Sequence, residues 1–468
     1  MTLLKYSRWM LSAVAVSAMV VSLTGPSASV YADTTVQANQ GGGSNLDELP
    51  QSSHHLLTST ARKTWNYFVA ATASKTGLPD DRINVPVNGQ QTSVNTTSPT
   101  DIAMYMMSLA SARDLGIISE AEANRRLSTL LNTLEQLPKW QGFLYNWYTT
   151  TDGSVTNNFI STVDLGWYAA GLVVDRQAFP RFAAQITKLL NAMNFATLYD
   201  PSMNQMYGGY DPTTQQFTGW HYGNINTESR VADYIAIGTG DVPSKLWWGV
   251  YRTLPASWAW QNQVPIGPTV TYDGVPVFEG HYTLYGETYV PSWGGSMFEA
   301  LMPTLVLKEQ QLGTHALGLN DQRMVDLQIH YALDVQHYPV WGISPSALPN
   351  NGYGVFGVPG LGCINYEENG TITPHASFLA LSFAPQQALS NLEILANRYH
   401  MMGPYGFYDS VNVNTQAVAH ADLALDEGMI LVSIDNFLHH GAIQNDFNRD
   451  SVGKAPQDLL KEEKFSIQ

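Results

Sequence analysis

Four carboxylates of this chain share one sequence context, early in an apolar run that follows a loop rich in aromatic residues, Gly, Ser or Thr. An isolated acid in such a run is costly to bury unless it is partnered or used. Two carboxylates in one cleft can perform acid–base chemistry, one donating a proton while the other activates water or attacks directly. The candidate catalytic residues are Asp164 in FISTVDLGWYAAGLVV, Glu228 in NINTESRVADYIAIG, Glu299 in SWGGSMFEALMPTLVL and Asp426 in AHADLALDEGMILVSIDNF.

Each of these acids also has a structural explanation, which the sequence alone leaves open. Asp and Glu in the first turn of a helix accept hydrogen bonds from free backbone amides and complement the helix dipole. Glu228, which follows Asn226 and Thr227 at a predicted helix start, fits that explanation without any chemistry. Four such acids beside glycines and aromatic residues nevertheless favour a shared cleft, lined by the starts of several helices.

Aromatic residues in loops rich in Gly and Asn indicate what such a cleft could bind. Sugar rings present apolar C–H faces that stack on aromatic rings, while Asn, Asp, His and Arg side chains bind sugar hydroxyls. The same aromatic residues could instead fill a large helical core, and both explanations remain open at this point. The predicted substrate-binding residues are Trp147, Trp220, His221, Tyr222, Arg230, Trp293, Trp341, Tyr353 and Tyr366.

Other chemistries find little support in the sequence. It contains no Gly-x-Ser-x-Gly elbow, no phosphate-binding loop and no His-Glu-x-x-His zinc motif, so we expect neither a metal nor a cofactor. The single cysteine, Cys363, has no neighbouring base that would mark it as a nucleophile. The net charge of −16 argues against nucleic acid and anionic membranes as partners, whereas a neutral poly- or oligosaccharide is unaffected by it.

Helices are the elements that must position these side chains. Ser98, Pro99 and Gly116 mark the ends of one helix, and Ser119 begins another with two acids in its first turns. Strand signals are confined to residues 268–280 and to the segment around 143–148. This pattern fits an all-α domain of about six helical hairpins. Further helical runs begin near residues 59, 162, 180, 227, 295, 321, 374, 385 and 421.

The two ends of the chain carry separate signals. Residues 1–32 combine Lys5 and Arg8, an apolar run of about 15 residues and a small-residue cleavage site at Ala32, which predicts a secretory signal peptide. An uncleaved membrane anchor is the alternative, but the run is short for a span. We expect a flexible leader at 33–56, a catalytic domain at 57–447 and a charged tail at 448–468 outside the fold. The mature protein is expected to be bacterial, secreted or at the cell surface, monomeric and without a membrane span.

Several longer motifs occur in a fixed order. They include SPTDIAMYMMSLASARDLGIIS, FLYNWYTTTDGSV, FISTVDLGWYAAGL, NTESRVADYIAIGTGDVP, SWGGSMFEALMPTL, GYGVFGVPGLG, TITPHASFLALSFAPQQAL and LDEGMILVSIDNF. With these motifs, roughly residues 59–447 resemble the glucoamylase-like domain of bacterial endo-β-1,2-glucanases and of the transglycosylating region of cyclic β-1,2-glucan synthases. The first half of this segment is also similar to a bacterial family of unknown function.

The resemblance implies an (α/α)6 barrel, an all-α toroid in which loops at the N-terminal ends of the inner helices form the active-site cleft. It also implies that Glu228 and Glu299 are the leading catalytic carboxylates. Asp164 and Asp426 would then act as base, as water-positioning residues or as sugar-binding residues. The positions of all four acids at predicted helix starts agree with such a cleft.

Glycoside cleavage needs one protonated carboxyl group and one ionised carboxylate. Partial desolvation by the aromatic loop at residues 220–222 favours the protonated form of Glu228, which suits a general acid. Glu299 or Asp426 would supply the second carboxylate. We therefore expect a glycoside hydrolase or transglycosylase that acts on a polysaccharide such as a β-glucan. The alternative is a non-catalytic surface protein that binds carbohydrate or helps to process an exopolysaccharide with the same aromatic cleft.

Overall fold

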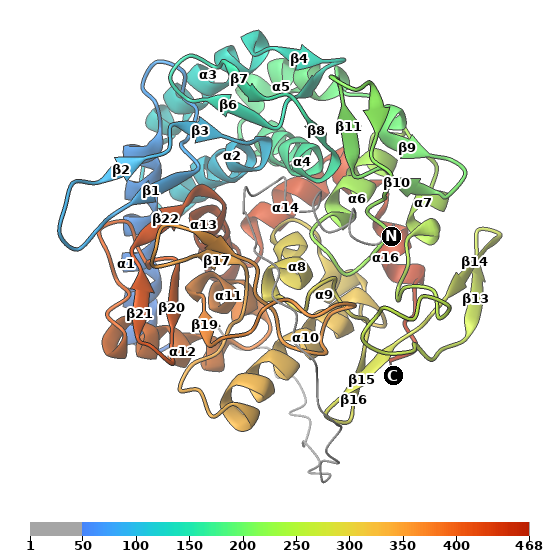
Figure 1. Cartoon of the computed structure of the whole chain (residues 1–468). Coiled ribbons are helices and arrows are strands. Elements are labelled where there is room, and N and C mark those ends of the chain that lie inside the picture. The colour runs from blue at the N-terminus through green and yellow to red at the C-terminus, as the bar shows by residue number, and fades with distance from the viewer. Residues whose placement is uncertain (1–48, 468) are drawn as a thin grey trace.

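Residues 49–467 are described by the computed structural model, in which helices form two concentric rings (Figure 1). In the inner ring, α2 packs against α4 and α13, α4 against α6, and α11 against α8 and α13. Arg230, at the start of α6, closes this ring by donating a hydrogen bond from Nη2 to the Ala300 carbonyl of α8 at 2.7 Å. The inner helices are α2 (Pro99–Asp114), α4 (Thr162–Ala178), α6 (Arg230–Gly238), α8 (Met297–Leu301), α11 (Pro374–Leu379) and α13 (Ala424–Leu438).

One outer helix precedes each inner helix along the chain, so the ring is built from helical hairpins. The expected all-α (α/α)6 barrel is therefore confirmed. The outer helices are α1 (Gln51–Ala71), α3 (Glu120–Gln136), α5 (Ala183–Asn191), α7 (Lys245–Gly249), α10 (Leu317–His330) and α12 (Pro385–Arg398). Shorter turns of helix are η3 (Pro180–Phe182), η4 (Phe195–Leu198), η5 (Met302–Leu305), α9 (Glu309–Leu312), η6 (Tyr331–Val335) and η7 (Ala380–Ser382).

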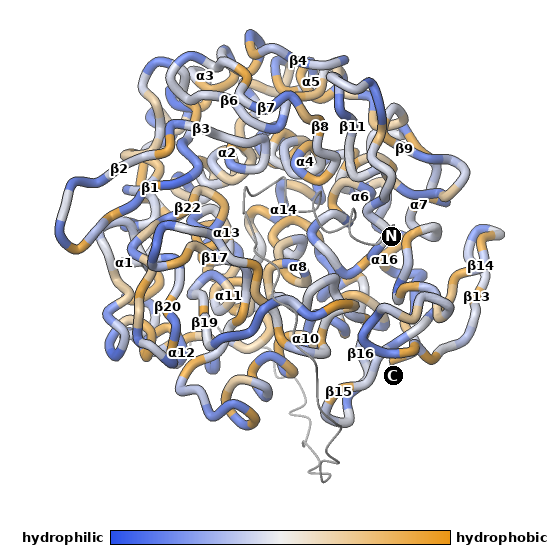
Figure 2. Tube along the Cα trace, viewed as in Figure 1, coloured by the Kyte–Doolittle hydropathy of each residue, from blue (hydrophilic) through white to orange (hydrophobic). Residues whose placement is uncertain are grey.

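The two rings differ in their hydrophobic patterns because they differ in their exposure to water. Every residue of α2 from Ile102 to Ala112 is buried, as expected of a helix surrounded by other helices. The outer helix α3 instead buries a stripe that includes Leu127, Leu130 and Leu134 and exposes its other face. Figure 2 shows the corresponding hydrophobic residues on the helices around the centre and hydrophilic residues along outer loops.

Helix caps and small residues fix how the inner helices begin and pack. The predicted cap of α2 is confirmed, since Ser98 Oγ accepts from the Asp101 amide at 3.1 Å and Asp101 Oδ2 accepts from the Ser98 amide at 2.8 Å. The predicted Ser119 cap of α3 is confirmed as well. Gly166 of α4 lies so close to α6 that a Cβ atom there would come within 2.5 Å of the Ala232 Cα atom.

Short strands end within two residues of the starts of α2, α4, α11 and α13 and form small sheets in the loops that precede these helices. β3 ends at Thr97, two residues before α2, and β8 and β22 run directly into α4 and α13. The two predicted strand regions are confirmed by the hairpin β13–β14 and by β5 and β6. The strands are β1 (Arg82–Asn84), β2 (Thr92–Ser93), β3 (Thr96–Thr97), β4 (Lys139–Trp140), β5 (Phe143–Leu144), β6 (Trp147–Thr149), β7 (Val155–Asn157), β8 (Ile160–Ser161), β9 (Tyr199–Asp200), β10 (Gln205–Met206), β11 (Gly209–Asp211), β12 (Gln216–Phe217), β13 (Thr269–Tyr272), β14 (Val275–Phe278), β15 (Tyr282–Leu284), β16 (Glu287–Tyr289), β17 (Ser346–Ala347), β18 (Tyr353–Gly354), β19 (Thr371–Ile372), β20 (Ser410–Asn412), β21 (Ala417–Ala419) and β22 (Ala421–Leu423).

The prediction that residues 448–468 lie outside the fold is wrong. Residues 448–467, the part of this segment that the structure describes, belong to the fold. This segment contains the end of α14 (Ala442–Arg449), α15 (Ser451–Lys454) and α16 (Gln457–Glu462). α14 packs against α2, α4 and α13, and its Phe447 is fully buried. Beyond α16, Glu463 forms a fully buried ion pair with Arg252. The segment looked like an exposed tail because of its charges, but at least one of these charges, that of Glu463, is paired inside the core.

The leader predicted for residues 33–56 also ends earlier than expected, because α1 already begins at Gln51. Leu57, Trp65 and Phe68 of this helix are buried in the core, which explains why the segment is helical rather than flexible. Residues 1–48, which include the predicted signal peptide and most of the leader, lie outside the described residues. Across residues 49–467, none of the helices combines the length and the apolar character needed to cross a membrane.

Candidate active site

The four predicted catalytic acids lie at the N-terminal ends of four different inner helices. Asp164, Glu299 and Asp426 are in the first turns of α4, α8 and α13, as predicted. Glu228 differs, because it lies in a turn two residues before α6, where Ser229 holds the cap position. The explanation of Glu228 as a first-turn residue is therefore wrong, and α6 has no side-chain hydrogen bond at its cap.

Glu228 is a half-buried carboxyl group with raised proton affinity. Burial raises its pKa to about 8, and the negative charge of Glu299 adds to the rise, with a smaller contribution from Asp164. Its own backbone amide and the charge of Arg230 oppose the shift only in part. A carboxyl group in this state is protonated at neutral pH and can donate a proton.

Glu299 is held as a hydrogen-bonded cap of α8. Its carboxylate accepts from the Ser292 hydroxyl at 2.9 Å, from the Gly294 amide at 3.0 Å and from the Ser296 amide at 3.1 Å. The Ser296 hydroxyl in turn accepts from the Glu299 amide, which completes a capping box. Burial raises the pKa of Glu299, while these donors favour its ionised form. Most of its lone pairs are thus already occupied by the protein.

Asp164 is partnered in a similar way. It accepts from Thr100 Oγ1 of α2 at 2.5 Å through one oxygen. In the amide orientation that satisfies its neighbours, Asn146 donates to the other oxygen at 3.1 Å and accepts from Trp147 Nε1 at 3.0 Å. Burial raises the pKa of the Asp164 carboxyl, and hydrogen bonds from Ser161 and Thr100 oppose that rise. Trp147, a predicted binding residue, is therefore linked to this acid through Asn146.

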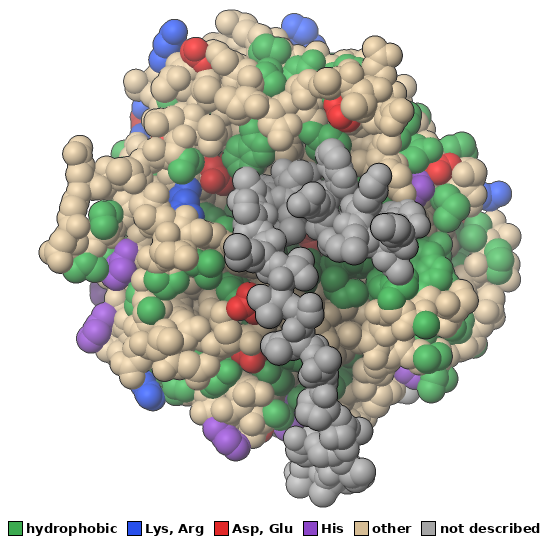
Figure 3. All heavy atoms as spheres, in the orientation of Figure 1, with side chains coloured by type: hydrophobic (Ala, Val, Ile, Leu, Met, Phe, Trp, Pro, Cys, Tyr) green, Lys and Arg blue, Asp and Glu red, His purple; other side chains and the backbone are tan. Residues whose placement is uncertain are grey.

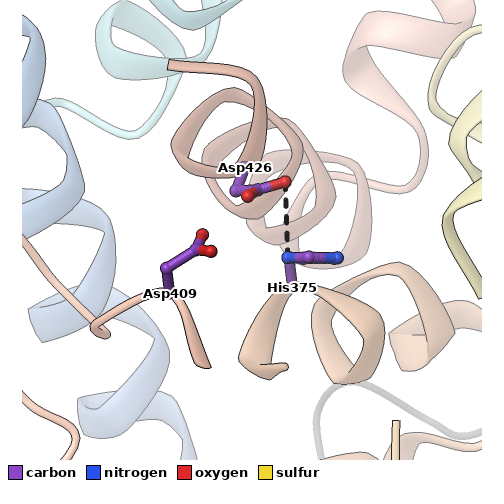
Figure 4. Close-up of side chains that lie close together, drawn as sticks. All are labelled: His375, Asp409 and Asp426. Atoms are coloured by element: carbon purple, nitrogen blue, oxygen red, sulfur yellow. Dashed lines mark ion pairs between the residues drawn. The ribbon is translucent and has the colours of Figure 1, made fainter. Parts of the chain in front are cut away.

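Asp426 belongs to a second cluster, together with Asp409 and His375 (Figure 4). It stands at the start of α13, across the ring of inner helices from α6 and Glu228. Its Oδ1 atom lies 3.3 Å from Nδ1 of His375, the second residue of α11. Burial raises the pKa of Asp426 well above its ordinary value, and the neighbouring Asp409 raises it further. Burial also lowers the pKa of His375 to about 4, which keeps the imidazole neutral.

The geometry of this cluster permits two kinds of chemistry. One ligand atom from each of His375, Asp409 and Asp426 lies within 4.8 Å of the others, so the three side chains could hold a metal ion. The same proximity lets two buried carboxyl groups share one proton, as coupled carboxylate pairs do. Oδ1 of Asp409 has no hydrogen-bond partner within residues 49–467, so it is free for either task.

Three predicted tyrosines connect the acids. Glu228 and Asp164 both raise the pKa of Tyr222, after burial, and Asp426 and Glu228 act in the same way on Tyr353. The charges on both sides of the site, that of Asp426 more strongly than that of Glu228, therefore act on the Tyr353 hydroxyl.

Tyr366 belongs with Glu299. Burial and then the charges of Glu299 and Glu228 raise the pKa of its hydroxyl, which is also within hydrogen-bonding reach of Glu299. Its ring lies flat against the backbone at Gly294, where a Cβ atom would approach it to 2.2 Å. Only glycine allows this contact, which explains why the first residue of the Gly294–Gly295 pair before α8 is a glycine.

Two predicted tryptophans, Trp220 and Trp293, lie in the loops before α6 and α8. Trp293 is half-buried and directly precedes Gly294, and Trp220 is half-buried and meets Tyr222 edge-on with ring centroids 5.1 Å apart. Figure 3 shows Asp and Glu side chains at several points around the middle of this face, with hydrophobic side chains beside them. Acidic groups next to aromatic surface are suited to a ligand with both hydroxyl groups and apolar faces.

Three predicted binding residues have other roles. Arg230 is fully buried, and its guanidinium group binds Glu309 through two hydrogen bonds of 2.7 Å, so the prediction that it contacts substrate is wrong. Trp341 is also wrong as a binding residue, because it is 2% exposed and packs in the core. His221 is paired with Asp200 at 2.9 Å and stacked on Tyr207.

Sequence reasoning missed several residues of the site. His375 follows Pro374 at the start of α11, and this N-terminal Pro could have marked the histidine as a helix-start residue like the four acids. The only sequence signals for two other residues are their positions. Asn146 directly precedes Trp147, and Thr100 lies two residues after Ser98, the cap of α2. Asp409 lies in a loop before β20 and carries no local signal, because it reaches the cluster only through the tertiary fold.

The fold and the site together define an (α/α)6 barrel with a carboxylate-rich site at the starts of its inner helices. Residues 265–451 match the family model described as "Putative glucoamylase", and residues 59–237 match a family described as a protein of unknown function, DUF3131. The predicted resemblance to the glucoamylase-like group is thereby confirmed.

Two solved structures share the fold closely. An endo-β-1,2-glucanase from Chitinophaga pinensis, in complex with sophorotriose and glucose, superposes with a TM-score of 0.73 at 20% identity and covers 88% of this chain and 98% of its own. An endo-β-1,2-glucanase mutant from Talaromyces funiculosus, in complex with β-1,2-glucan, has a TM-score of 0.70 at 13% identity, with 89% of each chain covered.

Among curated proteins, the cyclic β-(1,2)-glucan synthase NdvB of Rhizobium meliloti is 24% identical over 86% of this chain. The chain spans only 18% of the length of that relative. The similarity therefore concerns one region of a much longer protein.

Proposed function

We propose that this protein is a glycoside hydrolase or transglycosylase that cleaves a neutral β-glucan, with β-1,2-glucan as the first candidate substrate. The observation that carries the proposal is Glu228, a half-buried acid with a pKa raised to about 8 among other carboxylates. The likeness to endo-β-1,2-glucanases and to part of a cyclic β-1,2-glucan synthase supports the choice of substrate.

In this mechanism Glu228 donates its proton to the glycosidic oxygen as the bond to the anomeric carbon breaks. Among the charged groups around it, those of Glu299, Arg230 and Asp164 act on its pKa most strongly. The charge of Glu299 keeps the proton on Glu228 until the leaving oxygen takes it. When Glu228 loses its proton, two neighbouring negative charges result. The hydrogen bonds that stabilise the ionised Glu299 therefore also favour the protonated form of Glu228 before the reaction.

Asp426 is the proposed base. Glu299 and Asp164 have their oxygens engaged by protein donors, whereas Asp426 is accompanied by a second carboxyl group, Asp409, that can share a proton with it. Asp426 would take a proton from the water, or from the acceptor hydroxyl, that attacks the anomeric carbon. Because Glu228 and Asp426 stand at the starts of α6 and α13, which face each other across the ring of inner helices, we expect room for that nucleophile and therefore inversion at the anomeric carbon.

The decisive experiment measures the release of reducing ends from β-1,2-glucan and from a panel of other neutral glucans by the purified protein. We expect cleavage of one β-glucan by the wild type and its loss in Glu228→Gln and Asp426→Asn. Full activity in both variants would contradict these roles. Binding of a glucan without cleavage, retained in both variants, would instead identify a non-catalytic carbohydrate-binding protein. Nuclear magnetic resonance of the first product reads out its anomeric configuration and tests inversion separately.

Export is a further part of the proposal and rests on residues 1–32 alone. The composition of this segment supports removal of a signal peptide after Ala32. Mass spectrometry of the protein recovered from its native host would give the N-terminal residue directly. An N-terminus at Asp33 in the extracellular fraction would support this proposal, and an intact Met1 in the cytoplasm would contradict it.

A further inference from the structure

Two tryptophans outside the site expose unusually large apolar surfaces. Trp258 and Trp260 are 39% and 47% exposed, and both lie in the loop that connects α7 to β13. Tryptophan is normally highly buried, and an exposed pair on a rigid loop marks a binding surface more often than a packing defect. Figure 3 shows hydrophobic side chains gathered to the right of the centre of this face.

These two rings continue the aromatic lining of the site. The Trp258 and Trp260 rings are stacked, with centroids 5.6 Å apart and planes 25° apart. Trp260 meets Trp293 at 6.0 Å, and Trp293 directly precedes Gly294, whose amide binds the Glu299 carboxylate. A line of aromatic rings therefore leads from the catalytic loop outward to the surface.

The loop that carries the two rings is fixed to the same segment as the catalytic loop. Asn262 donates from its amide to the Cys363 carbonyl at 2.8 Å and from Nδ2 to the Gly362 carbonyl at 2.9 Å. On the other side of that segment, the Ile364 amide donates to the Trp293 carbonyl at 3.0 Å. These hydrogen bonds connect the loop of the two rings with the loop before Glu299, and such preorganisation reduces the entropy lost when a ligand binds.

The charge of this loop limits the ligand class. Residues 251–266 contain a single charged residue, Arg252, and its side chain is fully buried against Glu463. A charged partner would find no counter-charge on this loop. A neutral carbohydrate chain needs none, because its C–H faces stack on indole rings and its hydroxyls remain in water.

We propose that Trp258 and Trp260 form a distal binding surface for the part of a neutral polysaccharide that leaves the site past Trp293. This inference rests on the proposed function for the identity of the polysaccharide. It makes the protein an enzyme that prefers long chains, because a short oligosaccharide bound at Glu228 does not reach the outer rings. The surface raises the affinity for long substrates without taking part in the reaction itself.

The test compares kcat/KM on polymeric β-1,2-glucan with kcat/KM on the shortest β-1,2-linked oligosaccharide that the wild type cleaves. We expect W258A/W260A to lower the ratio of these two values about tenfold, since each lost stacking contact is worth roughly 0.5–1.5 kcal/mol. We expect W258F/W260F, which keeps an aromatic ring at both positions, to recover most of the ratio. An unchanged ratio in W258A/W260A overturns the inference.

A matched control distinguishes ring stacking from general apolar contact. Val264 and Ile266 are 72% and 71% exposed in the same loop and carry no ring. We expect V264A/I266A to leave the ratio unchanged, and a drop as large as that of the tryptophan variant would identify a non-specific apolar surface instead. Thermal unfolding of all variants verifies that the loop substitutions leave the fold intact.

Failure of the proposed function is recognised separately. If the wild type releases no reducing ends from β-1,2-glucan, the proposed substrate or activity is wrong regardless of the tryptophans. Affinity electrophoresis then decides the inference, with gels that contain β-1,2-glucan or another neutral glucan. Retardation of the wild type in one of these gels, and its loss in W258A/W260A, supports the distal surface. Equal mobility of the two proteins in every gel overturns it.

Discussion

Glu228 and Glu299 stand at the starts of successive inner helices and are electrostatically coupled. Burial raises the pKa of Glu228 to about 8, and the charge of Glu299 contributes most among its charged neighbours. Glu299 can exert this effect because the Ser292 hydroxyl and the Gly294 and Ser296 amides stabilise its ionised form. One carboxylate therefore sets the protonation state of the other.

The first prediction concerns the proposed acid itself. Glu228→Gln keeps the shape of the side chain but cannot deliver a proton, so we expect kcat on a cleaved glucan to fall by about 10²–10⁴-fold. Initial rates of reducing-end release measure the loss. Glu462→Gln is the control, because Glu462 is an exposed acid of α16 and should retain full activity. A Glu228→Gln variant as active as this control would exclude Glu228 as the acid.

The second prediction is a pH profile. Since Glu228 must be protonated to act, kcat/KM should decline as the pH rises through about 8, the pKa of this group. Glu299→Gln removes a negative charge beside Glu228, which makes its ionisation easier and lowers its pKa. We therefore expect the alkaline limb of the profile to move to lower pH in Glu299→Gln, and an unmoved limb would show that the two groups are not coupled.

The third prediction concerns the cluster of His375, Asp409 and Asp426. If the two carboxyl groups share a proton, as we propose, dialysis against a chelator leaves activity unchanged and elemental analysis finds no stoichiometric metal. Asp409→Asn removes the partner of the base, and we expect kcat to fall by roughly ten- to a hundredfold with the fold retained. Loss of activity on chelation, restored by one divalent cation, would instead assign a metal to these side chains.

The fourth prediction separates Arg230 from the substrate. Its guanidinium group is fully buried and paired with Glu309, and removal of one partner from a buried ion pair costs about 3–5 kcal/mol. We expect Arg230→Met to lower the thermal stability strongly. The double variant Arg230→Met/Glu309→Met should recover part of that loss, because it removes the carboxylate that the single substitution leaves unpaired, and only Asp321, 3.6 Å from Arg230, then lacks its partner. Recovered stability together with an unchanged KM would confirm a structural role, whereas a specific rise in KM would indicate substrate contact.

The fifth prediction concerns the C-terminal segment. Glu463 pairs with Arg252 in an interior position and also accepts a hydrogen bond from Trp247 Nε1 at 3.1 Å. Glu463→Ala leaves the arginine charge unpaired, so we expect a loss of about 3–5 kcal/mol in the free energy of unfolding. Chemical denaturation measures it. Glu462→Ala, one residue earlier and exposed, should change stability by less than about 0.5 kcal/mol.

Local sequence patterns were sufficient for much of the fold. Ser98 with Asp101 and Ser119 with Glu122 form caps that depend only on residues three apart, so their helices begin where predicted. The same holds for Asp164, Glu299 and Asp426, which stand early in apolar helices. Such features are visible in sequence because all interacting atoms come from one turn of the chain.

Charge and aromatic character were less reliable guides, because their meaning depends on distant residues. Arg230 looked like a ligand-binding residue beside Glu228, yet its partner is Glu309. The C-terminal segment looked like a solvated tail because it is rich in charges, yet Glu463 neutralises Arg252 inside the fold. Trp341 and Trp293 both follow Pro-containing loops, but only the tertiary packing buries one and leaves the other beside the site.

The sequence by itself determined that this chain builds paired helices and places carboxylates at their starts, because caps and hydrophobic periodicity act over a few residues. Only the tertiary structure decided which acids act on one another. Closure of the ring brings Glu299 beside Glu228 and Asp409 beside Asp426. It also removes these groups from water, and burial is the largest cause of the raised pKa values of Glu228 and Asp426 on which the proposed chemistry depends.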